Sequence, residues 1–216
     1  PKKVLNRVNL TITRGERVAF VGKNGEGKST MANIITKMIP FDSGSADLGY
    51  EVYMGYFAQN QTDLLNFKLT PIELMEECSS TKTYGQIRQT LGDFLFSEDD
   101  MEKKISVLSG GEKTRLAIAC LLNSPSNLLV LDEPTHHLDM ISKDVLKNAL
   151  MQYSGTLIVV SHDRDFITGL TESSIEFRDQ GIKKHLGDIS VYLNESEKSL
   201  FKSLNKIESK GDKGST

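Results

Sequence analysis

The amino-acid sequence predicts an α/β fold with a largely parallel β-sheet. Short apolar runs at 17–21, 128–131 and 157–160 have the length and composition of buried central strands. Residues with helical periodicity fill the chain between these runs, and strands that alternate with helices favour a parallel sheet covered on both faces. The length of 216 residues suits one such domain with a small helical unit added to it.

Other segments predict the elements that surround this sheet. Residues 4–12 alternate apolar and polar side chains, which predicts one or two N-terminal antiparallel strands. Residues 52–57 are strand-like, and the apolar spacing over 31–38 predicts a helix that Pro40 ends. The segment 175–185 has Asp-Gln-Gly near its middle, so we expect a terminal hairpin there.

A small helical subdomain is expected inside the α/β core, over about residues 62–122. Thr70 and Thr83 each stand before a helical pattern, with Glu or Gln three positions later, which is the capping-box arrangement. We therefore expect one domain over residues 1–194 with this subdomain inserted, followed by a C-terminal helix and polar tail over 195–216.

A glycine-rich loop follows the first buried run. Residues 22–29, Gly-Lys-Asn-Gly-Glu-Gly-Lys-Ser, match the full pattern of a phosphate-binding loop between a strand and a helix. The glycines let the backbone wrap around a polyphosphate, with a helix N-terminus beneath it. Lys28 brings positive charge to the terminal phosphates, and the Ser29 hydroxyl can bind Mg²⁺. These features predict a P-loop NTPase core in which the nucleotide contacts Gly22, Asn24, Gly25, Glu26, Gly27, Lys28, Ser29 and Thr30.

Two carboxylates end the second buried run. Asp132 and Glu133 follow residues 128–131, and adjacent side chains of a strand point in opposite directions. The two groups are therefore expected to have different roles. Asp132 is predicted to hold Mg²⁺ together with Ser29, and Glu133 to orient or deprotonate the attacking water.

Composition and charge argue against some kinds of surface and site but do not exclude a local basic patch. A net charge of −3 and a pI near 5.9 argue against a generally basic nucleic-acid-binding surface. No apolar run approaches the ~20 residues that span a bilayer, so no membrane insertion is expected and the cytoplasm is the expected compartment. Cys78 and Cys120 are far apart in the sequence and predict neither a zinc site nor a disulfide framework.

A second glycine-containing motif distinguishes among nucleotide-hydrolysing proteins. Residues 108–113, Leu-Ser-Gly-Gly-Glu-Lys, resemble the signature motif of ATP-binding cassettes, or ABC proteins. A helix N-terminus, a hydroxyl and two glycines make a second phosphate-binding surface from Ser109, Gly110 and Gly111. Because one domain binds one nucleotide, the second surface is expected to serve the nucleotide of a neighbouring cassette. The resemblance thus implies ATP bound between two cassettes.

Further motifs fit this resemblance, which assigns roles to them. Gln59 matches the glutamine that contacts Mg²⁺ and the attacking water, and His162 matches the switch histidine that contacts the γ-phosphate. Leu138-Asp139 matches the loop that touches the partner cassette. The resemblance therefore implies an ATPase with ATP and Mg²⁺ as cofactors, with Glu133, His162 and Gln59 as catalytic residues, and with Ser29, Gln59 and Asp132 as metal ligands.

A narrower resemblance rests on five segments of the sequence, 22–30, 56–61, 108–115, 132–139 and 161–166. Together these segments are similar to the ABC-F subfamily, and the resemblance covers about residues 4–194. Members of this subfamily are soluble, carry two cassettes in one chain and mostly act on the ribosome in translation or antibiotic resistance. The resemblance implies the C-terminal cassette of a longer chain, with a second cassette and the ribosome or tRNA as partners.

Two other functions are compatible with the same motifs. One is the cytoplasmic ATPase subunit of a membrane ABC transporter, which would also lack membrane segments. The other is a switch that binds ATP and barely hydrolyses it, although the presence of Glu133 argues against this. Two features depart from the family pattern. His136 stands where the family usually has Asn, and the aromatic residue that stacks on adenine would precede Pro1.

Overall fold

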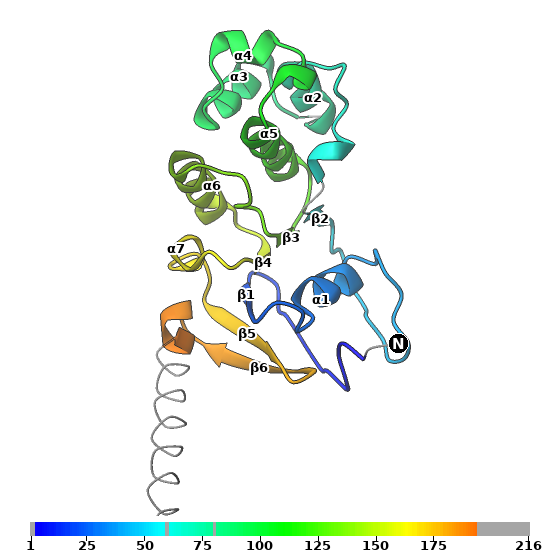
Figure 1. Ribbon diagram of the computed structural model, residues 1–216. Coiled ribbons are helices and arrows are strands. Elements are labelled where there is room, and N and C mark those ends of the chain that lie inside the picture. The colour runs from blue at the N-terminus through cyan, green and yellow to red at the C-terminus, as the bar shows by residue number, and fades with distance from the viewer. Residues whose placement is uncertain (1–2, 59–60, 80, 194–216) are drawn as a thin grey trace, which may run out of the picture.

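One mixed β-sheet organises the protein, whose computed structural model describes residues 3–58, 61–79 and 81–193 (Figure 1). Within these residues six strands form the sheet in the order β2-β3-β4-β1-β5-β6. Neighbouring strands are parallel except for the antiparallel pair β5–β6. The strands are β1 (Arg17–Gly22), β2 (Met54–Phe57), β3 (Leu128–Asp132), β4 (Thr156–Val160), β5 (Ser173–Arg178) and β6 (Gly181–Leu186).

Helices connect the strands, and most of them lie between β2 and β3 in the chain. Figure 1 shows α2 to α5 grouped at the end of the molecule nearest β2 and β3, with β5 and β6 toward the other end. The helices are α1 (Lys28–Ile35), η1 (Gln61–Leu64), α2 (Pro71–Cys78), α3 (Tyr84–Asp93), α4 (Glu98–Glu102), η2 (Ile105–Val107), α5 (Gly110–Asn123), α6 (Met140–Gln152) and α7 (Arg164–Ile167).

Side chains alternate between the two faces of the sheet and build two hydrophobic clusters. Val18 and Phe20 of β1 pack with Met31 of α1 on one face. Ala19 and Val21 belong to a second cluster, which contains residues of α2, α3, α5, α6 and α7. The two-residue period of a strand dictates this division. Helices α1 and α5 therefore cover opposite faces of the same sheet.

The predicted fold class is confirmed, since the apolar runs at 17–21, 128–131 and 157–160 form the adjacent parallel strands β1, β3 and β4. The predicted terminal hairpin is also present as β5 and β6. Asp179 and Gln180 form its turn, and both have positive φ, at 51° and 64°. This is the backbone that a two-residue type I′ turn requires.

The expected N-terminal antiparallel strands over residues 4–12 do not form, and the described residues before β1 contain no strand. Their apolar side chains pack onto the α1 face of the sheet instead. From this segment Asn6 donates one backbone hydrogen bond to Gln180, at 2.8 Å, where a strand would need a ladder of such bonds. The alternation of apolar and polar side chains therefore indicates that one face of this segment is buried. It does not indicate that the segment pairs with a strand.

Helix boundaries follow the predicted signals except at the end of α1. Thr70 and Thr83 form the predicted capping boxes with Glu73 and Gln86. Helix α1 ends at Ile35, before Pro40, and Lys37 follows with a φ of 58°. The left-handed residue stops the helix before proline can. The boundaries of the domain and of its helical subdomain remain a prediction, and the tail 195–216 lies outside the described residues.

Arg17 joins β1 to the end of α6. Its guanidinium group donates to the backbone oxygens of Leu150, Tyr153 and Leu170 at 2.5, 2.8 and 2.9 Å. Leu150 belongs to the last turn of α6, and Tyr153 is its C-cap. A cation at this position satisfies carbonyl groups that a helix end leaves unpaired and interacts favourably with the helix dipole.

We predict that Arg17→Met lowers the free energy of unfolding by about 2–4 kcal/mol, because three partly buried carbonyl groups lose a charged donor. Urea denaturation followed by circular dichroism measures this change. Arg14→Met is the matched control, since Arg14 is exposed and donates one hydrogen bond, to Tyr50. Equal destabilisation by the two substitutions would contradict the assignment.

Candidate nucleotide-binding and hydrolysis site

The predicted phosphate-binding loop lies between the end of β1 and the start of α1. Gly22 has a φ of 136°, and a Cβ atom there would lie 2.4 Å from the backbone oxygen of Phe177. Gly27 has a φ of 102°, and its Cβ would lie 2.8 Å from a methyl group of Leu5. Both positions therefore require glycine, for backbone conformation and for space. The neighbouring strand β5 and the N-terminal segment leave the loop little other room.

Lys28 places a buried positive charge inside this loop. The residue is 6% exposed, and its Nζ donates to the backbone oxygens of Gly22 and Lys23 at 2.8 and 2.9 Å. Burial lowers the pKa of Lys28, while the charges of nearby carboxylates, Glu133 first, act in the opposite direction. No ion pair among the described residues includes Lys28. An ammonium group has three donors, so one N–H remains for a further acceptor.

The first turn of α1 lacks a side-chain cap. Its N-cap residue is Gly27, and no side chain accepts a hydrogen bond at this end of the helix. In the part of the chain that the structure describes, each of the six other α-helices has a Ser, Thr or Asp cap. The uncapped amide groups and the helix dipole favour an anion beside Lys28.

Ser29 and Asp132 bring two oxygen ligands together from different elements. The Ser29 hydroxyl donates to Oδ1 of Asp132 at 3.0 Å. Burial raises the pKa of Asp132, although the hydrogen bond from Ser29 and the charge of Lys28 act in the opposite direction. Oxygen ligands are those that Mg²⁺ prefers, so this pair fits the predicted metal ion. No cluster of three or more His, Cys, Asp or Glu that could hold a metal occurs among the residues described.

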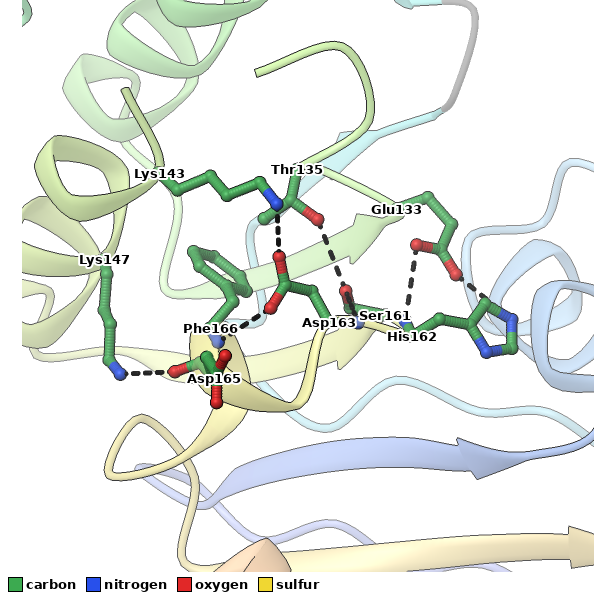
Figure 2. Close-up of polar contacts among 9 residues, drawn as sticks. All are labelled: Glu133, Thr135, Lys143, Lys147, Ser161, His162, Asp163, Asp165 and Phe166. Atoms are coloured by element: carbon green, nitrogen blue, oxygen red, sulfur yellow. Dashed lines mark hydrogen bonds and ion pairs between the residues drawn. The ribbon is translucent and has the colours of Figure 1, made fainter. Parts of the chain in front are cut away.

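Glu133 turns away from the strand that Asp132 ends. Its φ is 52°, and its N–H donates to the backbone oxygen of Val160 at 2.8 Å. Figure 2 shows its carboxylate facing His162. Oε1 lies 3.4 Å from His162 Nε2, and Oε2 accepts a hydrogen bond from the His162 backbone N–H, also at 3.4 Å. Burial raises the pKa of Glu133, while the charge of His162 acts in the opposite direction. A carboxylate in this position can accept a proton.

Hydrogen bonds fix the segment that carries His162. Thr135 and Ser161 share a hydrogen bond between their hydroxyl oxygens at 3.5 Å, and the Asp163 N–H donates to Ser161 Oγ at 3.1 Å. The Asp163 carboxylate in turn accepts from Lys143 Nζ of α6 at 2.6 Å, as Figure 2 shows. His162 thus stands between two anchored residues.

Helix α6 holds the same segment at a second point. Lys147, one turn after Lys143, donates from Nζ to the backbone oxygen of Asp165 at 2.7 Å (Figure 2). The Asp163 side chain also caps α7 by accepting from the Phe166 N–H at 3.1 Å. Although burial raises it, the pKa of Asp163 is lowered overall by the hydrogen bond from Lys143 and by backbone donors.

The signature residues lie apart from this group. Ser109 caps α5, since its Oγ accepts from the Glu112 N–H at 3.3 Å while the Glu112 carboxylate accepts from the Ser109 N–H at 2.6 Å. Helix α5 covers the sheet face opposite to α1. Gly111 adjoins the turn before α6, because a Cβ there would lie 3.3 Å from the backbone oxygen of His137. No hydrogen bond between described residues links Ser109, Gly110 or Gly111 to Lys28.

The structure therefore places Lys28, Ser29, Asp132, Glu133 and His162 at the carboxyl ends of the adjacent strands β1, β3 and β4. The other predicted contacts of the loop, Asn24, Gly25, Glu26 and Thr30, belong to the same loop or to the first turn of α1. Gln59 lies outside the described residues. Asp139 caps α6 by accepting from the Ser142 N–H at 2.7 Å. His136, the departure from the family pattern, lies with its Nδ1 3.1 Å from Nε2 of His137.

Sequence reasoning missed the residues that support the site. Lys143 and Lys147 have helical spacing, but nothing in that spacing indicates which loop they contact. Tyr56 was also missed. Its hydroxyl donates to Oδ1 of Asn33 in α1 at 2.9 Å, and burial together with the charge of Asp132 raises its pKa to about 12. Tyr56 links β2 to the helix that begins at Lys28.

Comparisons with known proteins identify the cassette. A model of the family described as ABC transporter matches residues 5–136. The protein YdiF of Bacillus subtilis is 43% identical over 197 residues, which are 91% of this chain and 30% of that protein. ABC transporter F family member 2 of Arabidopsis thaliana is 41% identical over 94% of this chain and 30% of its own length. The chain thus spans less than a third of these relatives, and the resemblance to ABC cassettes is confirmed.

Solved structures agree with the fold. A dimeric, post-hydrolysis structure of the ATP-binding cassette MJ0796 bound to ADP and Pi is 26% identical in sequence and has a TM-score of 0.67. It matches 85% of this chain and 90% of its own. Across residues 3–58, 61–79 and 81–193, no helix has both the length and the apolar character to cross a membrane.

We predict that Lys143→Met lowers the turnover of nucleotide hydrolysis by about tenfold. Lys143 holds Asp163, which adjoins the predicted catalytic residue His162, and a small displacement of such a residue reduces the rate. Lys143→Arg should restore most of the rate, since it keeps the charge that Asp163 accepts from. Lys147→Met, which removes a contact to a backbone oxygen only, should have the smaller effect. Steady-state phosphate release measures all three, and equal rates for wild type and Lys143→Met would contradict the positioning role.

Proposed function

The chain belongs to the ABC transporter family, and from that premise we propose that it binds Mg²⁺-ATP at residues 22–29 and hydrolyses it in a site completed by a second cassette. One observation carries the proposal. Buried Lys28, the pair Ser29–Asp132 and the carboxylate of Glu133 lie together beside an uncapped helix N-terminus.

The loop supplies the charge that a triphosphate requires. Lys28 and the first amide groups of α1 are donors without an anionic partner among the described residues, and a buried cation of this kind gains from an anion nearby. Ser29 and Asp132 would hold Mg²⁺, which would supply positive charge to neutralise and orient the phosphates. Gln59 is proposed as a third ligand of this ion.

Glu133 and His162 are placed for the hydrolytic step. We assign Glu133 as the residue that accepts a proton from the attacking water, since its carboxylate is partly buried and its pKa is raised by burial. His162 lies against the same carboxylate, and its proposed contact is with the γ-phosphate. Thr135, Ser161 and Asp163 fix the backbone on both sides of His162.

The second cassette follows from the position of the signature. Ser109, Gly110 and Gly111 lie at the start of the helix that covers the sheet face opposite to α1. This position supports the proposal that they bind a nucleotide other than the one at residues 22–29. Ser109 Oγ accepts within its capping box and keeps its O–H proton for a phosphate of the partner's nucleotide. The dimeric arrangement of MJ0796 supports this pairing.

For the whole protein, we propose an ABC-F type factor with the second cassette in the same longer chain and the ribosome or tRNA as its partner in the cytoplasm. The relatives that carry the F-family name at about 40% identity favour this over a transporter subunit. Two copies of this chain would form the equivalent dimer.

We predict that Glu133→Gln keeps ATP binding and reduces turnover by roughly 10²–10⁴-fold, the usual contribution of a positioned base. The bound triphosphate should then hold two cassettes together. Light scattering with and without ATP measures this as a shift from 24.0 kDa to twice that mass. Glu76→Gln, on an exposed position of α2, is the matched control. Normal hydrolysis by Glu133→Gln would refute the assignment of the base.

We predict that Lys28→Ala weakens ATP binding at least about tenfold, because charge-assisted hydrogen bonds to phosphate are strong. Lys23→Ala is the control within the same loop, since the Lys23 side chain is exposed and its backbone oxygen is retained. Isothermal titration calorimetry measures both affinities. An unchanged affinity for Lys28→Ala would exclude the loop as the nucleotide site.

The raised pKa of Glu133 predicts a pH dependence. A base acts only when deprotonated, so turnover should fall as the pH decreases through the raised pKa, above the ~4.3 of an ordinary Glu. A pH–rate profile, with circular dichroism to show that the protein remains folded, measures this acid limb. If the acid limb lay at the pKa of an ordinary Glu, burial would not control the pKa of Glu133.

A further inference from the structure

The two cysteines of the chain lie together where α2 packs against α5. Cys78 is the last residue of α2 and is partly buried, and Cys120 lies in the second half of α5 and is 7% exposed. Their separation in the sequence predicts no pairing, but both side chains pack in the same hydrophobic cluster. Helix packing, not chain proximity, brings the two thiols to one place.

Contacts between sulfur atoms define the arrangement. The Cys120 thiol lies with its Sγ 3.5 Å from Sδ of Met75. Met75 and Cys78 are three residues apart in α2 and therefore share one face of that helix. Cys78 therefore lies one turn of α2 beyond the sulfur atom that Cys120 contacts, on the side of α2 that packs against α5.

The two thiols differ in reactivity. Interaction with the Cys120 thiol lowers the pKa of Cys78, against the opposing effects of burial and of the Glu77 charge. The same contact and deep burial raise the pKa of Cys120. A thiolate is the reactive form of cysteine, and an accessible thiolate beside a second thiol is the arrangement found in redox-sensitive pairs.

We propose that Cys78 and Cys120 form a reversible disulfide that joins α2 to α5, with Cys78 as the attacking thiol and Cys120 as the resolving thiol. The oxidant is a low-molecular-weight disulfide. The Cys78 thiolate attacks one of its sulfur atoms, forms a mixed disulfide and releases one small thiolate. Cys120 then loses its proton and attacks Cys78 Sγ, which closes the protein disulfide and releases the second small thiolate. Two protein thiols are oxidised and one small disulfide is reduced.

Local backbone structure favours closure of this bond. A disulfide needs Cα atoms within about 7 Å and a defined dihedral angle, so one partner must adjust. Cys78 ends its helix, and Ser79 follows with an extended backbone, φ −130° and ψ 98°. A residue at a helix end can move without breaking the hydrogen bonds of a helix interior.

The disulfide would fix the helix that carries the signature. Helix α5 begins beside Ser109 and runs to the interface with α2. A bond from Cys120 to α2 therefore ties this helix to its neighbour by a covalent link. The chemistry involves no group of the nucleotide site, so the proposal is independent of the proposed function.

The test treats the reduced full chain with oxidised glutathione under native conditions, followed by intact-mass measurement and peptide mapping. The wild type should lose two hydrogen atoms, retain no glutathione and yield one peptide pair joined through residues 78 and 120. Dithiothreitol should reverse the change. Cys120→Ala should stop at a glutathione adduct on Cys78, and Cys78→Ser should not react, because Cys120 is buried. Met75→Leu is the matched control and should still form the bond.

Three results would overturn the proposal. They are a stable glutathione adduct on wild-type Cys78, two thiols that remain free after treatment, or a bond between two chains.

The rate of ring closure provides a second measurement. Closure in the native protein should be at least about tenfold faster than in urea, because folding places the thiols together. Equal rates would show that the fold does not bring them into contact.

Discussion

The burial of the Lys28 ammonium group is the constraint on which the site depends. A cation that is 6% exposed needs acceptors, and it finds two in the backbone of its own loop. Those carbonyls point inward because Gly22 adopts a φ of 136° against the backbone of Phe177. Strand β5, which lies far along the chain from this loop, therefore shapes it. Among the described residues no carboxylate forms an ion pair with Lys28, although the charges of Glu133, Asp132 and Glu26 act on its pKa.

The acidic side of the site follows from strand geometry. Asp132 is the last residue of β3 and directs its carboxylate to Ser29, whereas the left-handed backbone of Glu133 turns the next carboxylate to His162. Two adjacent acids thus occupy different environments. Burial raises the pKa of both carboxyl groups, and the charge of Lys28 opposes this shift. This separation fits the proposed division of roles, in which Asp132 holds a metal ion and Glu133 exchanges a proton.

Local structure could be predicted from the sequence where a motif requires both a particular backbone conformation and a particular chemical group. The loop at residues 22–29 and the capping boxes at Thr70 and Thr83 are such cases. Periodicity was insufficient for residues 4–12, because alternation indicates a buried face and does not indicate a hydrogen-bonding partner. Contacts between distant helices and loops had no local signal at all. The bond from Lys143 to Asp163 depends on how α6 packs against the loop after β4, which only the folded chain determines.

Several of the contacts that support the site involve helix α6. Asp139 caps its first turn, Lys143 and Lys147 hold the segment around His162, and Arg17 of β1 binds its last carbonyls. The turn that precedes α6 adjoins Gly111, and the same helix contacts the segment around His162. In the proposed two-cassette site, α6 therefore connects the turn beside the signature to His162.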